Sequence, residues 1–167
     1  QGDIKELEKL LKPLSELRLK VLHIDNVNPV YVNEERAKVI VKYCTSGNIA
    51  AFGVESFDKN VVRENTLNCT PENAYRAIQI LNKVGSQCGP NGMPYFLPGI
   101  NIILGLKGET KQTLAENYTW LKKIYEDGLL LRRINIRQVT IFPGTKMDDI
   151  GYKYFKKNKK LYYSFRK

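Results

Sequence analysis

Two continuous apolar stretches constrain most strongly what this chain can fold into: NIAAFGVE at residues 48–55 and GINIILGL at residues 99–106. Turn-forming residues bound each stretch, and neither shows the apolar–polar alternation of a half-exposed strand. Stretches of this length are typical of strands buried on both faces, as in a parallel sheet. Between them, Thr70-Pro71-Glu72 provides an N-cap, a first-turn proline and a first-turn acid, which together predict a helix. The sequence therefore predicts a strand–helix–strand unit.

Further elements extend this alternation in both directions. Apolar residues at helical spacing predict a helix at 3–17, which Pro13 is expected to kink or divide. A strand is predicted at 18–25, and Asn33 is expected to cap a helix that Gly47 ends. After the second apolar stretch we expect a strand at 133–142, preceded by a helix that Thr110 caps and whose core face carries Leu114, Tyr118, Leu121 and Tyr125.

This order of elements determines the expected fold class. Strands that alternate with helices over short connections imply right-handed crossovers and a parallel sheet. We therefore expect an α/β fold with a mostly parallel sheet of about four strands flanked by helices. A closed eight-stranded barrel needs roughly 250 residues, and this chain has 167. The chain is expected to be either a small open domain or a partial (β/α) barrel.

Charge and cysteine content narrow the functional classes. The net charge of +10, from 27 Lys and Arg against 17 Asp and Glu, favours nucleic acid, anionic cofactors or acidic surfaces as partners. Residues 146–167 mix basic with aromatic side chains, which can pair with phosphates and stack on bases. The alternative is a C-terminal helix with a solvated Lys face. Cys44, Cys69 and Cys88 are spaced too widely to indicate a disulfide framework or a zinc site.

The chain carries no visible targeting signal. No apolar run approaches the ~20 residues of a membrane span, and no signal peptide is visible. Free cysteines suit a reducing compartment, so we expect a cytoplasmic protein with no membrane partner. The opening Gln1-Gly2 has no initiator Met and is expected to be a remnant of recombinant expression. We expect the partial barrel at 3–145 and a basic aromatic helix or tail at 146–167.

Polar residues follow every predicted strand, whereas the strand interiors are apolar. Ligands of parallel α/β sheets bind at the carboxyl ends of the strands, so these residues predict one site across the sheet. In chain order they are His23, Asp25, Asn26 and Asn28; Glu55, Ser56 and Asp58; Asn101, Gly105, Lys107, Gly108 and Glu109; and Arg137, Gln138, Pro143, Gly144 and Thr145.

Three segments carry a resemblance to a known family. GVESFDKNVVRENTLN at 53–68 resembles the end of the fourth barrel strand of radical SAM enzymes, and INIILGLKGETKQTL at 100–114 resembles the fifth. INIRQVTIFPGT at 134–145 is similar to the sixth strand with its Pro-Gly-Thr exit. Each segment alone is a weak signal, but the three occur in the family's order on strands of the right kind. The whole chain also resembles an archaeal group of uncharacterised radical SAM proteins with helix-hairpin-helix elements.

The resemblance implies roles for individual residues in binding S-adenosylmethionine. Glu55, with Ser56 beside it, corresponds to the strand end that accepts hydrogen bonds from the ribose hydroxyls. Asn101 corresponds to the fifth-strand polar residue that helps hold the same ribose, and stands where some relatives have Asp. Arg63 corresponds to a residue that pairs with the methionine carboxylate, which suits a guanidinium. Adenine contacts are implied for Ile103 and for the residues from Gln138 to Ile141, and Gly105 lets the backbone approach the ligand. Structural alternatives remain, namely a solvated acid for Glu55 and a surface charge for Arg63.

The main departure from the family is the absence of its cluster motif. Radical SAM enzymes hold a four-iron cluster through Cys-x3-Cys-x2-Cys near the first barrel strand, because thiolates suit iron. This chain has no such spacing. We expect the chain to be the C-terminal part of a longer oxidoreductase whose remainder supplies the 4Fe-4S cluster. Alone, it is expected to be inactive and to bind neither cofactor stably, with no metal-ligand residues and no assignable catalytic residue.

Other interpretations stay open at this point. His23 could transfer protons at neutral pH or be a packed strand residue. Asp25, Asn26 and Asn28 could contact substrate or form the turn before Pro29. The whole chain could be a nucleic-acid-binding module, or a non-catalytic domain that binds a nucleotide or a partner. The sheet edge left by an incomplete barrel could also form a homodimer.

Overall fold

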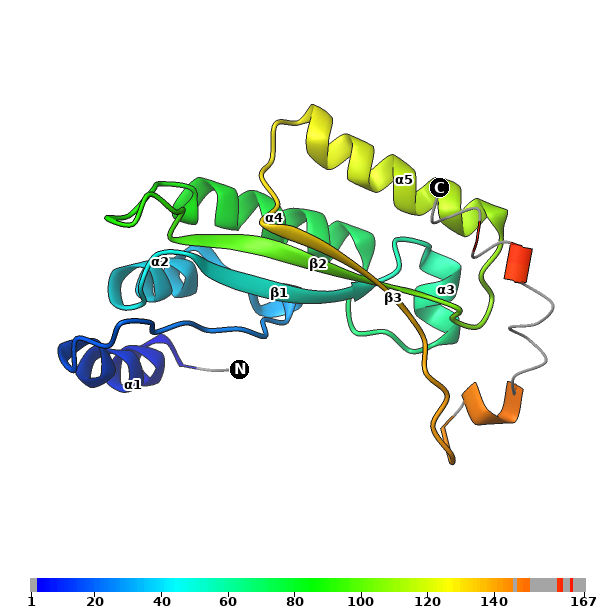
Figure 1. Ribbon diagram of the computed structural model, residues 1–167, viewed down its shortest axis with the longest axis horizontal. Coiled ribbons are helices and arrows are strands. Elements are labelled where there is room, and N and C mark those ends of the chain that lie inside the picture. The colour runs from blue at the N-terminus through cyan, green and yellow to red at the C-terminus, as the bar shows by residue number, and fades with distance from the viewer. Residues whose placement is uncertain (1–2, 146, 151–158, 161–162, 164–167) are drawn as a thin grey trace.

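Three parallel strands form the centre of the computed structural model, which describes residues 3–145, 147–150, 159–160 and 163. The strands are β1 (Asn48–Glu55), β2 (Phe96–Leu104) and β3 (Arg133–Gln138), and they lie in the order β1-β2-β3 (Figure 1). Their carboxyl ends point the same way, because both pairings are parallel. The predicted α/β fold with a parallel sheet flanked by helices is confirmed, with three regular strands.

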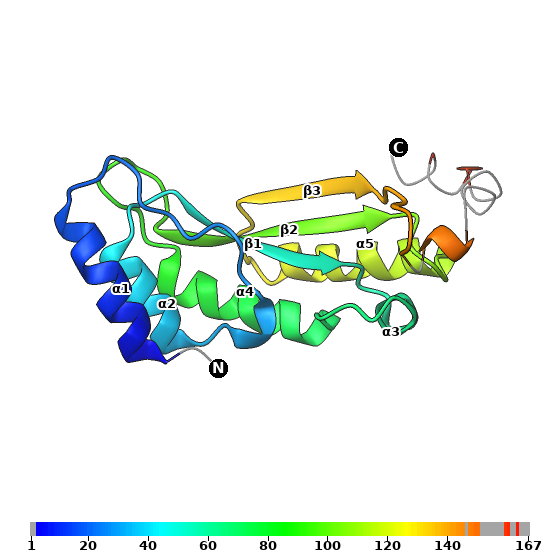
Figure 2. The same ribbon diagram turned by 90° about the horizontal axis from the view of Figure 1, so that it is seen from below.

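Helices cover one face of this sheet. Figure 2 shows α2 (Glu34–Tyr43), α4 (Pro71–Gly85) and α5 (Lys111–Glu126) on the same side of the strands, with α1 (Ile4–Glu16) outside α2. Fully buried Phe52, Ile100 and Ile102 of the strands share one apolar core with Ile78 and Leu81 of α4. Two short elements complete the fold, a 3-10 turn at Pro29–Tyr31 (η1) and α3 at Lys59–Glu64.

Each predicted N-cap is confirmed by a side-chain hydrogen bond, whereas the helix that Gly47 was expected to end stops at Tyr43. Asn33 Oδ1 accepts from the backbone N–H of Arg36 at 2.8 Å at the start of α2. Thr70 Oγ1 accepts from Asn73 N at the start of α4, and Thr110 opens α5 with a reciprocal capping box. These contacts satisfy amide groups that have no partner inside the helix. The caps therefore set where each of these helices begins.

The predicted strand at 18–25 is wrong. The segment is extended, but only its last residues pair with β1, where Asp25 O accepts from Ala51 N and Val27 N donates to Ala51 O. Earlier in the segment, backbone N–H groups donate to side chains and not to the backbone of a neighbouring strand. Asn48 Oδ1 accepts from Ile24 N at 3.1 Å, and Thr45 Oγ1 accepts from Leu22 N at 3.0 Å. Because these amide groups are already bonded, no backbone ladder extends along the segment.

Two further helix predictions concern α1 and α5. Of the two effects expected at Pro13, a kink or a division, division does not occur, because α1 is continuous through this residue. The predicted core face of α5 is correct only in part: Leu121 packs against the core, but Tyr118 and Tyr125 are 66% and 83% exposed whereas Thr113, Asn117 and Ile124 are buried. The buried polar residues are satisfied: Asn117 Oδ1 accepts from Phe57 N at 2.7 Å, and Thr113 Oγ1 donates to Asp58 at 2.7 Å. Hydrogen bonding, and not apolar periodicity alone, therefore selects the inward face.

The second face of the sheet carries no helix among the described residues, as Figure 2 shows. Because side chains alternate between faces along a strand, the residues opposite the buried isoleucines lie here. We call this surface the open face and define it by Gly53, Gly99, Asn101, Ile103, Arg133, Asn135 and Arg137. Strand β3 is exposed on its helix side as well, with Ile134 at 45% and Ile136 at 50% exposure. No described helix is long and apolar enough to cross a membrane.

Candidate functional site

A cavity of about 600 Å³ lies beside the carboxyl end of β1. Three segments that are separate in sequence form its walls: the stretch before η1, the end of β1 with its neighbour on β2, and the loop after α3. Its polar lining consists of Asn26, Asn28, Glu55, Thr66, Asn68 and Asn101. The structure therefore brings four of the sequence-predicted residues together at the predicted edge of the sheet, namely Glu55, Asn101, Asn26 and Asn28.

Glu55 is the most unusual residue of this cavity. It has a left-handed backbone (φ +62°), which costs a non-glycine residue roughly 1–2 kcal/mol, and the β1–β2 register shifts between Gly53 and Glu55. Its Oε2 atom is buried and makes no hydrogen bond among the described residues. Burial raises the pKa of this carboxyl, opposed by the positive charge of Arg137. Strain and an unsatisfied oxygen together are typical of a functional position.

Asn101 enters the cavity from the neighbouring strand. It lies in register with Gly53 of β1 and with Asn135 of β3, so the three occupy one row across the open face. Asn135 Nδ2 donates to Asn101 Oδ1 at 2.9 Å. Asn135 was not predicted from the sequence, because its position beside Asn101 depends on strand register. Polar and apolar residues alternate along residues 133–138, and this alternation is the signal that could have placed Asn135 on the same face as Asn101.

Two arginines hold the wall that Asn26 and Asn28 belong to. Arg76 of α4 donates to Val32 O at 3.2 Å and to Val30 O at 3.1 Å, and Arg36 of α2 donates to Tyr31 O at 2.6 Å. Asn28 Oδ1 in turn caps η1 by accepting from Val30 N. These contacts join residues that are distant in sequence, so sequence reasoning missed both arginines.

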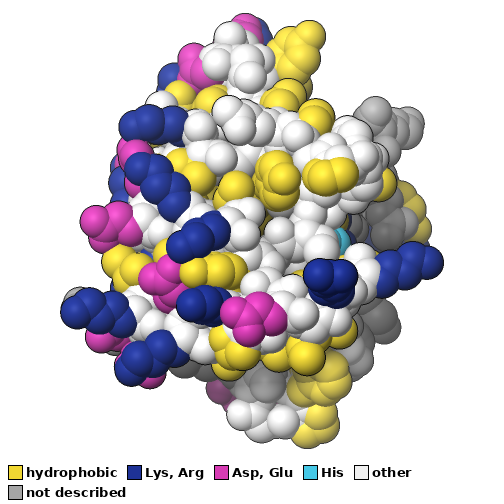
Figure 3. Space-filling model, turned by 90° about the vertical axis from the view of Figure 1, so that its left-hand side faces the viewer, with side chains coloured by type: hydrophobic (Ala, Val, Ile, Leu, Met, Phe, Trp, Pro, Cys, Tyr) yellow, Lys and Arg dark blue, Asp and Glu magenta, His cyan; other side chains and the backbone are white. Residues whose placement is uncertain are grey.

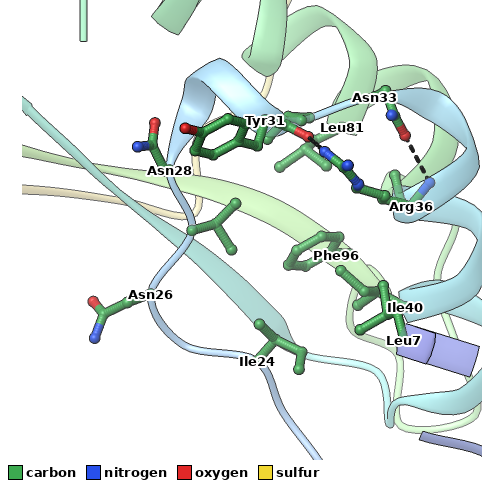
Figure 4. A pocket seen from close by; sticks show the side chains of 13 residues that line it. Leu7, Ile24, Asn26, Asn28, Tyr31, Asn33, Arg36, Ile40, Leu81 and Phe96 are labelled. Atoms are coloured by element: carbon green, nitrogen blue, oxygen red, sulfur yellow. Dashed lines mark hydrogen bonds between the residues drawn. The ribbon is translucent and has the colours of Figure 1, made fainter. Parts of the chain in front are cut away.

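The same wall faces a second, mainly apolar cavity of about 220 Å³. Figure 4 shows Ile24, Leu7, Ile40, Leu81 and Phe96 around it, with Tyr31 and Arg36 at its upper side. Asn26, Val27 and Asn28 line both cavities. The segment before η1 is therefore a single layer of chain between a polar cavity and an apolar one.

Ser56, Gly105 and Glu109 stabilise turns near the cavity. Ser56 is fully buried, and its Oγ accepts from Asp58 N at 3.1 Å. Gly105 N donates to Glu109 Oε2 at 2.7 Å, inside the turn from β2 to α5. Burial raises the pKa of Glu109 to about 7. None of the three lines the cavity of Glu55.

The remaining predicted residues also lie outside the cavity lining. Arg63 is exposed on α3, where its guanidinium donates to Asn60 Oδ1 at 3.0 Å. His23 is exposed beside Ser46 O, and Asp25 lies 3.8 Å from Arg133. Half-buried Ile103 is on the open face, whereas exposed Gln138 ends β3 and buried Ile141 follows it.

The described residues do not fit an iron–sulfur cluster. Cys44 and Cys69 are buried, and Cys88 is exposed. Burial raises the pKa of both Cys44 and Cys69 to about 11, whereas a cluster ligand must be a thiolate. No group of three His, Cys, Asp or Glu among the described residues is placed to hold a metal ion. Any such cluster would need ligands from elsewhere.

Basic side chains at the α1–α2 end of the molecule are interspersed with acidic ones. Figure 3 shows Lys and Arg beside Asp and Glu on this face, with no area of a single sign. Two ion pairs account for part of the pattern: Lys42–Glu8 at 3.0 Å and Lys83–Glu34 at 2.6 Å. The predicted basic aromatic tail at 146–167 lies mostly outside the described residues.

No protein-family model matches the chain. An uncharacterised protein of Methanocaldococcus jannaschii is 49% identical over 171 residues, which cover 98% of this chain and 32% of that protein. An uncharacterised protein of Archaeoglobus fulgidus is 51% identical over 155 residues, covering 89% of this chain and 29% of the relative. The chain thus spans about a third of the length of the curated relatives it matches.

Solved structures supply the comparison for the fold. Coproporphyrinogen III oxidase from Escherichia coli, described as a radical SAM enzyme, superposes with a TM-score of 0.60 at 18% identity over 93% of this chain and 32% of its own. The fold of this chain is similar to part of a radical SAM enzyme. The radical S-adenosylmethionine methyltransferase TsrM from Kitasatospora setae, solved with cobalamin and a [4Fe-4S] cluster, matches 87% of this chain and 25% of its own, with a TM-score of 0.60 at 15% identity.

Proposed function

We propose that this chain supplies the ribose- and adenine-binding part of the S-adenosylmethionine site of a radical SAM enzyme. It would do so as part of a longer protein. The observation that carries the proposal is the buried, unsatisfied Oε2 atom of Glu55 in the cavity at the carboxyl end of β1. The similarity in fold to two radical SAM enzymes and the greater length of the relatives support it.

The chemistry of the cavity fits a nucleoside. A carboxylate at a strand end can accept hydrogen bonds from two ribose hydroxyls, as acidic residues do in other nucleotide sites. Asn101 lies next to it, and its amide can donate to the same ribose. Glycine at 53 makes room for the Glu55 carboxylate, since a Cβ there would meet Glu55 Oε1 at 3.0 Å. Ile103, Gln138 and Ile141 would contact the adenine from β2 and the end of β3.

S-adenosylmethionine supplies, when bound, the radical chemistry of such enzymes, while the protein binds and orients it. In this chain Glu55 and Asn101 would fix the ribose, and the wall held by Arg76 would exclude water from one side. Because the described residues offer no cluster ligands, we propose that another part of the longer protein provides them. The chain alone would then be inactive.

The test measures equilibrium binding of 5′-deoxyadenosine to the longer protein by calorimetry. This probe carries the ribose and adenine but no carboxylate. Glu55→Gln should weaken binding by about tenfold, because it removes charge-assisted hydrogen bonds worth ~1.5–3 kcal/mol. Glu35→Gln, a change at an exposed acid on α2, should leave the affinity unaltered. Equal affinities of wild type and Glu55→Gln would refute the proposal.

A further inference from the structure

The open face carries a row of cationic and amide side chains that the nucleoside site does not use. On β3 the residues facing this side are Arg133, Asn135 and Arg137, in register with Gly99, Asn101 and Ile103 of β2. Asn135 connects this row to the cavity, because it donates to Asn101, which lines the cavity. These three residues of β3 therefore extend the candidate site from β1 across the open face.

The charge of Arg133 is partly balanced within the chain. Its side chain lies across the sheet over Gly99, where an added Cβ would meet Arg133 Cγ at 3.0 Å and Ile49 Cγ2 at 2.9 Å. The guanidinium thereby comes within 3.8 Å of Asp25 Oδ1, on the far side of β1. Arg133 thus connects β3 to the extended segment before η1.

Arg137 differs, because no ion pair within 4.0 Å is present for it in the described part of the chain. The positive charge of Arg137 lowers the pKa of Glu55, although burial of Glu55 raises that pKa by more. The Arg137 guanidinium and the Glu55 carboxyl therefore interact electrostatically without forming an ion pair. Asn135 lies two residues before Arg137 on the same face of β3. Its amide oxygen and the amide nitrogen of Asn101 are not used in the hydrogen bond that joins the two asparagines.

We propose that Arg137, with Asn135 beside it, forms a subsite for an anionic group of the second substrate. The inference rests on the proposed function, in which the nucleoside occupies the Glu55 side of the same face. A guanidinium pairs with a carboxylate or a phosphate through two parallel hydrogen bonds. A ligand held at Arg137 would lie next to a nucleoside held at Glu55. The anion would then hold a second substrate beside the bound nucleoside.

The first experiment uses anions alone, with inorganic phosphate and acetate as probes. Thermal unfolding of this chain is followed against probe concentration, with chloride keeping the ionic strength constant, because a ligand that binds the folded state raises the Tm. Arg137→Gln should weaken the apparent affinity for at least one probe by about tenfold. Arg132→Gln, which removes an equal charge immediately before β3, should change it by less than about twofold. An equal affinity in wild type and Arg137→Gln, or no response of wild type to either anion, overturns the inference.

The second experiment distinguishes a substrate anion from the carboxylate of S-adenosylmethionine itself. Binding of S-adenosylmethionine is measured in the longer protein, where Arg137→Gln should keep its affinity and Glu55→Gln should lose about tenfold. A loss in Arg137→Gln as large as that in Glu55→Gln would assign Arg137 to the cofactor and contradict a separate subsite. Failure of the proposed function is a different result, since Glu55→Gln would then bind S-adenosylmethionine as tightly as wild type.

Discussion

At the scale of single residues, Glu55 combines strain with an unmet hydrogen-bonding need. Its left-handed backbone and its buried oxygen without a partner both destabilise the folded chain. Neither is explained by packing, because Phe52 and Val54 of the same strand already fill the core. A ligand that donates hydrogen bonds to the carboxylate would offset the second cost. In the proposed function, this loss of stability is the consequence of a binding role for Glu55.

The variant Glu55→Gly tests both effects, on stability and on nucleoside binding. Glycine accepts φ +62° without strain, so this change should raise the free energy of unfolding by about 1 kcal/mol while abolishing nucleoside binding. Arg18→Gly is the matched control, because Arg18 has φ +49° and is exposed. It should give a similar stabilisation with binding intact. Urea denaturation measures the first effect, and loss of stability in Glu55→Gly would contradict the strain argument.

Glu109 should make stability depend on pH. Its pKa is raised by burial from 4.5 to about 7 in the folded chain, so the folded state holds a proton that the unfolded state has lost. The free energy of unfolding should therefore fall as pH rises from about 4.5 to about 7. The loss is on the order of 3 kcal/mol at most. Glu109→Gln retains an acceptor for Gly105 N and should flatten this dependence, which urea denaturation at several pH values measures. An unchanged slope would show that Glu109 is not the group responsible.

At the scale of elements, locally encoded features were predictable and contacts across the chain were not. The caps at Asn33, Thr70 and Thr110 and the buried strands β1 and β2 follow from neighbouring residues, so the sequence sufficed. Glu55 and Asn101 were found through the rule that ligands bind at strand ends. Asn135 and Arg76 were missed because strand register and helix docking decide their partners. The wrong strand at 18–25 has the same origin, since distant Asn48 and Thr45 take its amide groups.

Helix α5 offers a direct test of this distinction. Apolar periodicity predicted Tyr118 on the core face, whereas the structure buries Asn117, which accepts from Phe57 N at the turn after β1. Asn117→Ala leaves that buried amide without a partner and should cost about 1–3 kcal/mol of unfolding free energy. Tyr118→Ala should cost less than about 0.5 kcal/mol, since the residue is exposed. Urea denaturation of both variants measures these losses of unfolding free energy. A larger loss in Tyr118→Ala than in Asn117→Ala would favour the core face predicted from the sequence.

At the scale of the whole molecule, β3 is the element with least support. Its helix-side residues Ile134 and Ile136 are about half exposed, and β2 is the partner strand on its one paired side. An exposed apolar edge strand tends to pair with another chain. In a longer protein a further strand and helix would cover it. The relatives, about three times as long, have room for such a unit.

This exposure predicts self-association of the 167-residue chain. Light scattering after size exclusion should show a dimer or larger species, which Ile136→Lys reduces by placing a charge on the edge strand. Tyr125→Lys, at an exposed position of α5, should leave the association unaltered. The longer protein should not associate through this edge. A clean monomer of the unaltered chain at high concentration would count against an unprotected edge.

We propose that this chain carries part of a cofactor site whose cluster ligands lie elsewhere in a longer protein. Anaerobic reconstitution with iron and sulfide, followed by absorbance near ~400 nm and by S-adenosylmethionine cleavage, tests this proposal. We expect absorbance and cleavage for the longer protein and neither for the 167-residue chain. A stable four-iron cluster and cofactor cleavage by the 167-residue chain alone would contradict it.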